Sequence, residues 1–210
     1  MNHPDSKNSL RRALLVFVAG LALATHQAQA KMKARTTHPP KGMSFFQDDR
    51  DSVVYPTVKV QQQTWMAKNL VVSTKGSWCY GGSSSMCARF GRLYTWEAAR
   101  NACPSGWHLP SDQEWSILEN SLGDSSEPDK GKCLKATSWG GLDEVNFRAM
   151  AAGFRQANGN FANLNTSAYF WTASDTGPQA WSRHLGTNTP ANLRFAHSKN
   201  AAMSVRCLQD

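Results

Sequence analysis

Apolar residues recur at helical spacing after Ser111, where Trp115, Leu118 and Leu122 fall on one face. Glu114 stands three residues after Ser111, which is the spacing of a capping box. In that arrangement the serine oxygen and the glutamate carboxylate each accept a backbone N–H that the first helical turn leaves unpaired. The pattern therefore predicts a helix from residue 111 to about residue 122.

A second pattern, in which apolar and polar residues alternate, predicts strands. Residues 51–60 alternate in this way around Pro56, which favours an opening strand at a sheet edge. Residues 95–102 instead predict a short helix, because Thr95 can cap it and Pro104 prevents its continuation. Strand-like pieces separated by turns follow late in the chain, at residues 147–155, 169–173, 180–185 with 193–196, and 204–208. Two early helices followed by strands are typical of an α+β domain.

The composition favours one domain built from short elements. The chain has 210 residues with eight tryptophans and fifteen glycines, and long apolar runs are few, so short strands and many turns are expected. Residues 124–145 are polar and turn-rich, which predicts a long surface loop. We predict a single domain over residues 48–210, which is long enough to bury a core.

Residues 1–30 are typical of a signal peptide. A basic start is followed by twelve apolar residues from Ala13 to Ala24, and Ala28-Gln29-Ala30 is a small-x-small cleavage site. Twelve apolar residues are too few to span a bilayer, which needs about 20. We therefore expect cleavage after Ala30 and a secreted or periplasmic protein, with no transmembrane segment in the remainder.

Residues 31–47 are basic and contain almost no apolar side chain before Met43, which predicts a flexible linker. The whole chain carries a formal net charge of +8, and part of this excess lies in the linker. A basic arm that rests on an anionic surface is the alternative interpretation. No aromatic and basic motif of a known nucleic-acid binder is present, and an exported protein seldom meets nucleic acid, so no such partner is predicted.

Five cysteines in an exported chain predict two disulfides and one remaining thiol. Cys79 and Cys87 enclose a short loop with no evident core of its own, which a local bridge would stabilise. Cys103 and Cys207 would join the end of the first helix to the last strand. Cys133 is then left as a free thiol, expected to be buried and inert. No C-x-x-C and no His pair at ligand spacing occurs, so no zinc site is predicted.

Short motifs follow one another in a specific order along the domain. They are QTWMAKNL at residues 63–70, GRLYTW at 91–96, CPSGWHLPS at 103–111 and SVRC at 204–207, after a start at 49–60. In order and spacing they resemble the Fibrobacter succinogenes major paralogous domain family, over nearly the whole chain from about residue 48. Lys68 stands where that family usually has an acidic residue.

The resemblance implies a C-type lectin-like fold, shared with the formylglycine-generating enzymes. Two short helices would pack on short antiparallel strands beside a long loop region. The resemblance also implies the bridge from Cys103 to Cys207 at the last strand. The tryptophans at motif positions or on the apolar helix face are expected to lie in the core: Trp65, Trp96, Trp107 and Trp115.

No catalytic constellation is evident. The sequence has no G-x-S-x-G elbow, no H-E-x-x-H pair and no phosphate-cradling glycine loop, and His108 is expected to be a scaffold residue. The formylglycine-generating relatives hold copper with two cysteines near the end of the domain, where this chain has Cys207 alone. Glu127-Pro128-Asp129 resembles half of the calcium motif of C-type lectins, and the second half is missing. We therefore predict no enzyme activity, no cofactor and no metal.

Six candidates for ligand contact lie in the loops and late strands, where rings and charges can meet a sugar or a partner chain: Trp139, Trp171, Asp175, Trp181, Arg183 and Arg194. For any single ring, core packing is the favoured interpretation. We hypothesise an exported, non-enzymatic binding module at the cell envelope or extracellular surface, with a cell-surface polysaccharide or an envelope protein as partner. A structural subunit of a surface assembly is the main alternative, and an enzyme of the formylglycine-generating type is a weaker one.

Overall fold

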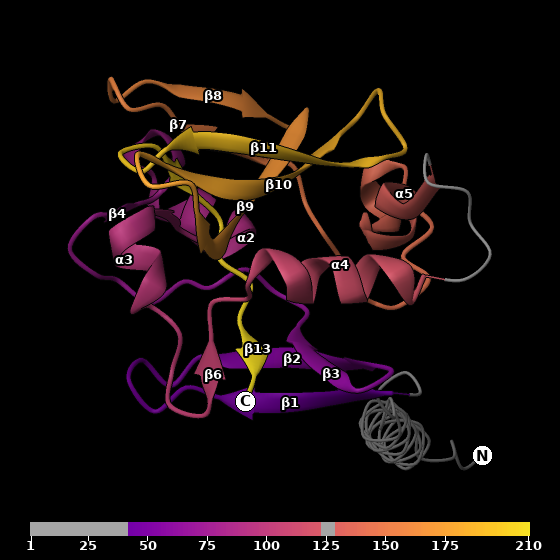
Figure 1. Ribbon diagram of the computed structural model, residues 1–210. Coiled ribbons are helices and arrows are strands. Elements are labelled where there is room, and N and C mark those ends of the chain that lie inside the picture. Colours follow the sequence, from indigo (N-terminus) through magenta and orange to yellow (C-terminus); the bar gives the residue numbers. More distant parts are fainter. Residues whose placement is uncertain (1–41, 123–128) are drawn as a thin grey trace, which may run out of the picture. The chain divides into compact units, whose positions relative to one another are not determined.

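The computed structural model describes residues 42–122 and 129–210, which form two β-sheets with short helices (Figure 1). The first sheet has the order β1-β2-β3-β13-β6, and each of its neighbouring pairs is antiparallel. Its strands are β1 (Met43–Gln47), β2 (Val54–Val60), β3 (Gln63–Met66), β6 (Trp107–His108) and β13 (Leu208–Gln209). The last strand of the chain is thus inserted between two earlier ones.

The second sheet has the order β11-β10-β9-β7-β12-β5-β4, with β8 paired to β7. Strands β9, β10 and β11 form an antiparallel meander, and β7 pairs with β9 in parallel. The strands are β4 (Ser77–Trp78), β5 (Leu93–Thr95), β7 (Ala152–Arg155), β8 (Phe161–Leu164), β9 (Ser167–Asp175), β10 (Gln179–Gly186), β11 (Asn192–Ser198) and β12 (Ala202–Met203). The meander supplies the longest strands of this sheet.

The helices are short: α2 (Ser84–Phe90), α3 (Trp96–Arg100), α4 (Asp112–Asn120), α5 (Lys130–Leu134), and the 3-10 turns η1 (Tyr80–Gly82) and η3 (Thr137–Trp139). Helix α4 begins with the predicted capping box of Ser111 and Glu114, and Thr95 caps α3 as predicted. Among the described residues, no helix is long and apolar enough to cross a membrane.

Helix α4 lies between the two sheets and joins their cores (Figure 1). The Trp115 ring is 4.9 Å from Trp65 of β3 and 5.5 Å from Phe170 of β9, measured between ring centroids. The four tryptophans expected in the core are 8% exposed or less, so that prediction is confirmed: Trp65, Trp96, Trp107 and Trp115. Burial of such large rings is the main source of stability for a domain with few long elements.

The predicted α+β, C-type lectin-like fold is wrong. Thirteen strands in two sheets make the described domain sheet-rich, which fits α+β only loosely, and no lectin fold is shown. Strands β4, β6 and β12 are each two residues long, so they are too short to show an alternating pattern in the sequence. Their partners lie far away along the chain, and tertiary pairing rather than local pattern creates them.

Two predicted boundaries also change. Residues 43–47 form β1, paired with β2, although they were assigned to the linker. Strand β2 is flanked by β1 and β3, so the strand that contains Pro56 is not an edge strand. The Pro56 carbonyl accepts a hydrogen bond from the Ala67 N–H at 2.7 Å. The predicted signal peptide and the linker up to residue 41 lie outside the described residues.

Both predicted disulfides are present, Cys79–Cys87 and Cys103–Cys207. Cys133 belongs to neither bridge, and its side chain is buried against the core that surrounds Trp115. Its sulfur lies 3.6 Å from the Asp129 carbonyl oxygen. The loop enclosed by the shorter bridge, which looked featureless in the sequence, contains η1 and the start of α2.

Candidate functional site

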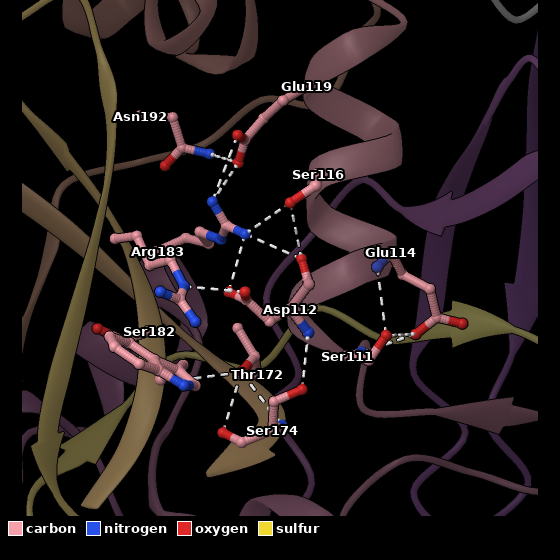
Figure 2. Close-up of polar contacts among 12 residues, drawn as sticks. Ser111, Asp112, Glu114, Ser116, Glu119, Thr172, Ser174, Ser182, Arg183 and Asn192 are labelled. Atoms are coloured by element: carbon pink, nitrogen blue, oxygen red, sulfur yellow. Dashed lines mark hydrogen bonds and ion pairs between the residues drawn. The ribbon is translucent and has the colours of Figure 1, made fainter. Parts of the chain in front are cut away.

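Charged residues gather in two regions of the domain, and the first is the junction of helix α4 with the β9–β11 meander. Figure 2 shows Arg183 of β10 reaching the helix between three of its residues. The first helical residue is also fixed from β9, because the Ser174 hydroxyl accepts the Asp112 N–H at 3.0 Å. The capping box starts α4 at this point, and the first turn of the helix is therefore polar and lies beside the strand ends.

Arg183 is the centre of this junction. Its Nη2 donates to the Asp112 carboxylate at 2.8 Å and to the Ser116 hydroxyl at 3.1 Å, and its Nη1 contacts Glu119 at 3.0 Å (Figure 2). The Asn192 amide of β11 also donates to Glu119, at 2.7 Å. The Arg183 side chain is 5% exposed, so two carboxylates neutralise a cation that is largely removed from water.

Trp181 and Arg194 complete the junction. The guanidinium carbon of Arg194 lies 3.3 Å from the Trp181 ring centroid, and its Nε forms an ion pair with the second Asp112 oxygen at 2.8 Å. One face of the ring is therefore covered by a cation of the same chain. Three of the six residues selected from the sequence thus come together, and their contacts hold α4 against the sheet.

Two further candidates lie elsewhere. Trp171 is fully buried, and its Nε1 donates to the Tyr94 carbonyl at 2.8 Å, so this ring packs in the core and is not open to a ligand. Strand β9 is packed on both faces there, which the sequence does not distinguish from a half-exposed strand. Asp175 is exposed and pairs with Lys199 at 2.7 Å, and this hydrogen bond lowers the pKa of Asp175.

The second charged region is a groove lined by four cationic residues, which we call the basic groove. It consists of two adjoining hollows of about 260 and 170 Å³ that share Arg89, Phe90 and Met150. The first hollow is also lined by Pro56, Ala67, Lys68, Asn69, Arg148 and Arg206, and the second by Ser138, Trp139, Ala151 and Asn165. These residues come from segments far apart in the sequence, so tertiary structure creates the groove.

Asn69 holds the walls of the first hollow together. Its amide nitrogen donates to the Phe90 carbonyl at 2.8 Å and to the Ser204 hydroxyl at 3.2 Å, while its amide oxygen accepts from Nε of Arg206. Gly91 ends helix α2 with a φ of +82°, and a Cβ there would lie 2.5 Å from that of Asn69. Only glycine fits this turn without strain, so α2 stops where the hollow begins.

Arg206 forms the floor of the first hollow and is 1% exposed. Its Nη1 donates to the carbonyls of Met66 at 3.0 Å and Phe147 at 2.6 Å, and its Nη2 donates to that of Arg148 at 3.1 Å. Together with the Asn69 oxygen, these acceptors are all neutral. Burial lowers the pKa of Arg206 to about 9, because the charged form loses its hydration.

The other cations surround this floor nearer to solvent. Lys68 is half-buried, with Nζ 5.9 Å from the Tyr55 ring centroid, while Arg89 and Arg148 are exposed. Asp143 is the acidic neighbour of this region, and one of its oxygens lies 3.9 Å from Nε of Arg148. Burial raises the pKa of Asp143, partly opposed by its hydrogen bond from the Arg148 N–H.

Trp139 lines the second hollow, which makes it the sequence candidate that the structure brings to the basic groove. Its indole N–H donates to the Thr187 hydroxyl at 2.9 Å, and Nζ of Lys135 lies 5.3 Å from its ring centroid. Lys135 in turn donates to the carbonyls of Gly186 and Thr189. The ring is therefore held in place at the entrance of a polar hollow.

The groups considered for catalysis or metal binding are placed as follows. His108 lies on the surface between Asp210 at 2.6 Å and Glu114 at 3.0 Å. Cys207 is bonded to Cys103, which leaves no pair of thiols at the end of the domain. Within residues 42–122 and 129–210, no group of three or more His, Cys, Asp or Glu side chains is placed to hold a metal ion.

The acidic turn Glu127-Pro128-Asp129 is described only at its last residue. Asp129 stands directly before helix α5, whose first turn it does not cap through its side chain. Glu127 and Pro128 lie outside the described residues, so the prediction that this half motif is only an acidic turn is not tested.

A family model, the Fibrobacter succinogenes major domain, matches residues 58–209. The chain belongs to this family. Comparison with curated proteins and with solved structures gives no match. The kinship with C-type lectins and formylglycine-generating enzymes that the resemblance implied is therefore not confirmed.

The Fibrobacter succinogenes major domain match contains all four cations of the basic groove. Asn69 and Arg206 belong to two of the motifs that identified the family, and the structure joins those motifs by a buried hydrogen bond. Sequence reasoning assigned both motifs to the scaffold and missed the groove between them. The available signal was a charged residue inside an apolar motif, as Arg206 is between Val205 and Cys207.

Proposed function

We propose that this protein is an exported, non-catalytic binding module of the cell envelope or extracellular surface, and that the basic groove holds a polysaccharide. Family membership and two disulfides are compatible with an extracellular module. The amino-terminal apolar run and its small-x-small site support export.

The observation that carries this proposal is the form of the groove. Two hollows adjoin past Phe90 and Met150, so a chain of linked sugars can occupy both. Trp139 offers an aromatic ring, and the exposed Ser138 and Asn165 offer hydroxyl and amide groups beside it. Sugar rings are recognised by aromatic faces together with polar groups that satisfy their hydroxyls.

The test is binding of the purified protein to immobilised envelope polysaccharides and to a glycan array. A Trp139→Ala variant is expected to bind at least tenfold more weakly, because the hollow loses its ring. Trp181→Ala is the matched control, since it removes a partly exposed tryptophan outside the groove, and it should bind within twofold of the unaltered protein. Circular dichroism checks that both variants are folded.

Two outcomes would contradict this function. Retention on none of the glycans, together with capture of one envelope protein, would favour a structural subunit of a surface assembly. Equal losses in the Trp139→Ala and Trp181→Ala variants would remove the groove as the binding site. A chelator is expected to leave binding unchanged, and chelator-sensitive binding would show that a cation takes part.

A further inference from the structure

The charges around the first hollow of the basic groove are unbalanced. Lys68, Arg89, Arg148 and Arg206 line it, and no acidic residue does. Asp143 is near Arg148, at 3.9 Å. In the described parts of the chain, no carboxylate oxygen lies within 4 Å of the charged nitrogens of the other three cations. One carboxylate therefore stands against four positive charges.

One of these four positive charges, that of Arg206, is buried in the interior and not exposed on the surface. A guanidinium has five N–H donors. Arg206 forms four hydrogen bonds, and all four go to neutral oxygens. The described residues provide no acceptor for its fifth N–H. By contrast, the equally buried Arg183 contacts two carboxylates. A cation taken out of water without a counter-charge is costly, and an anion placed beside it recovers part of that cost.

Three further cations line the same hollow as Arg206. Lys68 and the exposed Arg89 and Arg148 have long side chains that can turn toward a ligand over the floor. Arginine presents paired N–H groups that match the oxygens of carboxylate and phosphate. The second hollow, which contains Trp139, lies beside this charged one and is suited to the uncharged part of a sugar.

We propose that the first hollow binds the anionic substituent, a carboxylate or a phosphate, of an acidic polysaccharide. This inference rests on the proposed function, since it names the class of polysaccharide that the groove takes. The acidic group lies over Arg206 between Lys68, Arg89 and Arg148, and a neighbouring sugar ring lies against Trp139. Burial lowers the pKa of Arg206 and the nearby Asp143 offsets this only in part, which agrees with a site that is short of negative charge.

The experiment compares polymers that differ only in charge. Binding of the purified protein is measured to polygalacturonate and to its methyl ester, and to phosphorylated and unmodified dextran. The methyl ester keeps the sugar backbone and removes the carboxylate charge. We expect at least tenfold tighter binding to the charged member of one pair, and that pair identifies the acidic group. Raising the salt from 50 to 500 mM should weaken this binding, because exposed charges are screened.

The rim is tested with a double variant, Lys68→Gln with Arg89→Gln, which leaves the buried Arg206 intact. Its matched control, Lys59→Gln with Lys75→Gln, removes the same net charge at exposed positions that do not line the hollow. The rim variant should bind the acidic polymer at least tenfold more weakly, and the control should stay within twofold. Equal losses would indicate only a general attraction and would overturn the site.

The outcomes separate the two proposals. Equal binding to the charged and neutral members of both pairs, with binding still lost in Trp139→Ala, would overturn the anionic site and leave polysaccharide binding intact. Binding to none of the four polymers and to no glycan would overturn both. Binding to single-stranded DNA but to no acidic polysaccharide would show that the groove takes a different class of polymer.

Discussion

Two buried arginines show how the same side chain is used in different ways in one domain. Arg183 is held by two carboxylates of helix α4, whereas Arg206 is held by neutral oxygens alone. The first arrangement satisfies its own charge, so it is a structural joint. The second leaves positive potential at the floor of a hollow, so it can attract an anion.

At the residue scale, replacing Arg183 by Met should lower the free energy of unfolding by about 3 kcal/mol, because the partly buried Glu119 and Asp112 would keep their charges with one cation fewer. Arg194→Met is the control. Arg194 is 42% exposed, and its pair with Asp112 should contribute only ~0–1 kcal/mol. Urea unfolding monitored by tryptophan fluorescence gives both values. Similar losses in the two variants would contradict the assignment of Arg183 as the centre of the joint.

The candidate residues show what a single sequence can provide. It selected Trp181, Arg183 and Arg194 among six candidates, because rings and charges occur together in the loops and late strands. It did not reveal that they face helix α4, since the partner Asp112 is 71 residues away from Arg183. Whether such a group binds a ligand or a helix depends on this pairing.

At the scale of elements, helix α4 is held more firmly than its sequence indicates. The spacing of Ser111 and Glu114 predicts the capping box, and the structure confirms it. The structure adds His108 of strand β6, which bonds to Glu114 and to Asp210, the residue after β13. A local pattern thus predicts the helix start, and His108, six residues before Glu114, links it to the first sheet. The same histidine also bonds to Asp210, which is 102 residues away.

His108 makes this contact dependent on pH. Burial would lower the pKa of His108, but the hydrogen bonds to Asp210 and Glu114 outweigh it, and the net pKa is raised from 6.5. The stabilisation is therefore fully present below pH 6.5 and is lost as the pH rises through the raised pKa. The side chain is 38% exposed, so the effect should be about 0.2–1 kcal/mol.

Unfolding free energies measured from pH 6 to pH 9 test this, with His108→Gln as the control that should remove the decrease. The partly buried His184 and His197 do not affect the part of this window above pH 6.5. Burial lowers their pKa values, so their stabilising effect is lost only as the pH falls below 6.5. An unchanged profile in His108→Gln would show that another group causes the dependence.

The short elements explain the part of the fold that the sequence could not predict. Strand β13 is two residues long and pairs with both β3 and β6, so its position depends on contacts across nearly the whole domain. The long β10 was predicted in part, as the strand-like piece at residues 180–185. Helical spacing and turn residues are local signals, whereas the pairing of two-residue strands is not.

At the scale of the whole molecule, the two disulfides should contribute unequally. Cys103–Cys207 closes a separation of 104 residues and fixes the segment before β13, whereas Cys79–Cys87 closes only 8. In the chain-entropy model the long bridge contributes about 4.7 kcal/mol to the free energy of unfolding, and the short one about 2–3 kcal/mol. Replacing both cysteines of each bridge by alanine, followed by urea unfolding without reductant, measures the two losses. Arg206 directly precedes Cys207, so loss of the long bridge should also weaken binding of the acidic polymer. Loss of the short bridge should leave a folded protein that still binds it. A larger loss of stability from the short bridge would show that local strain or residual structure, rather than chain closure, decides the difference.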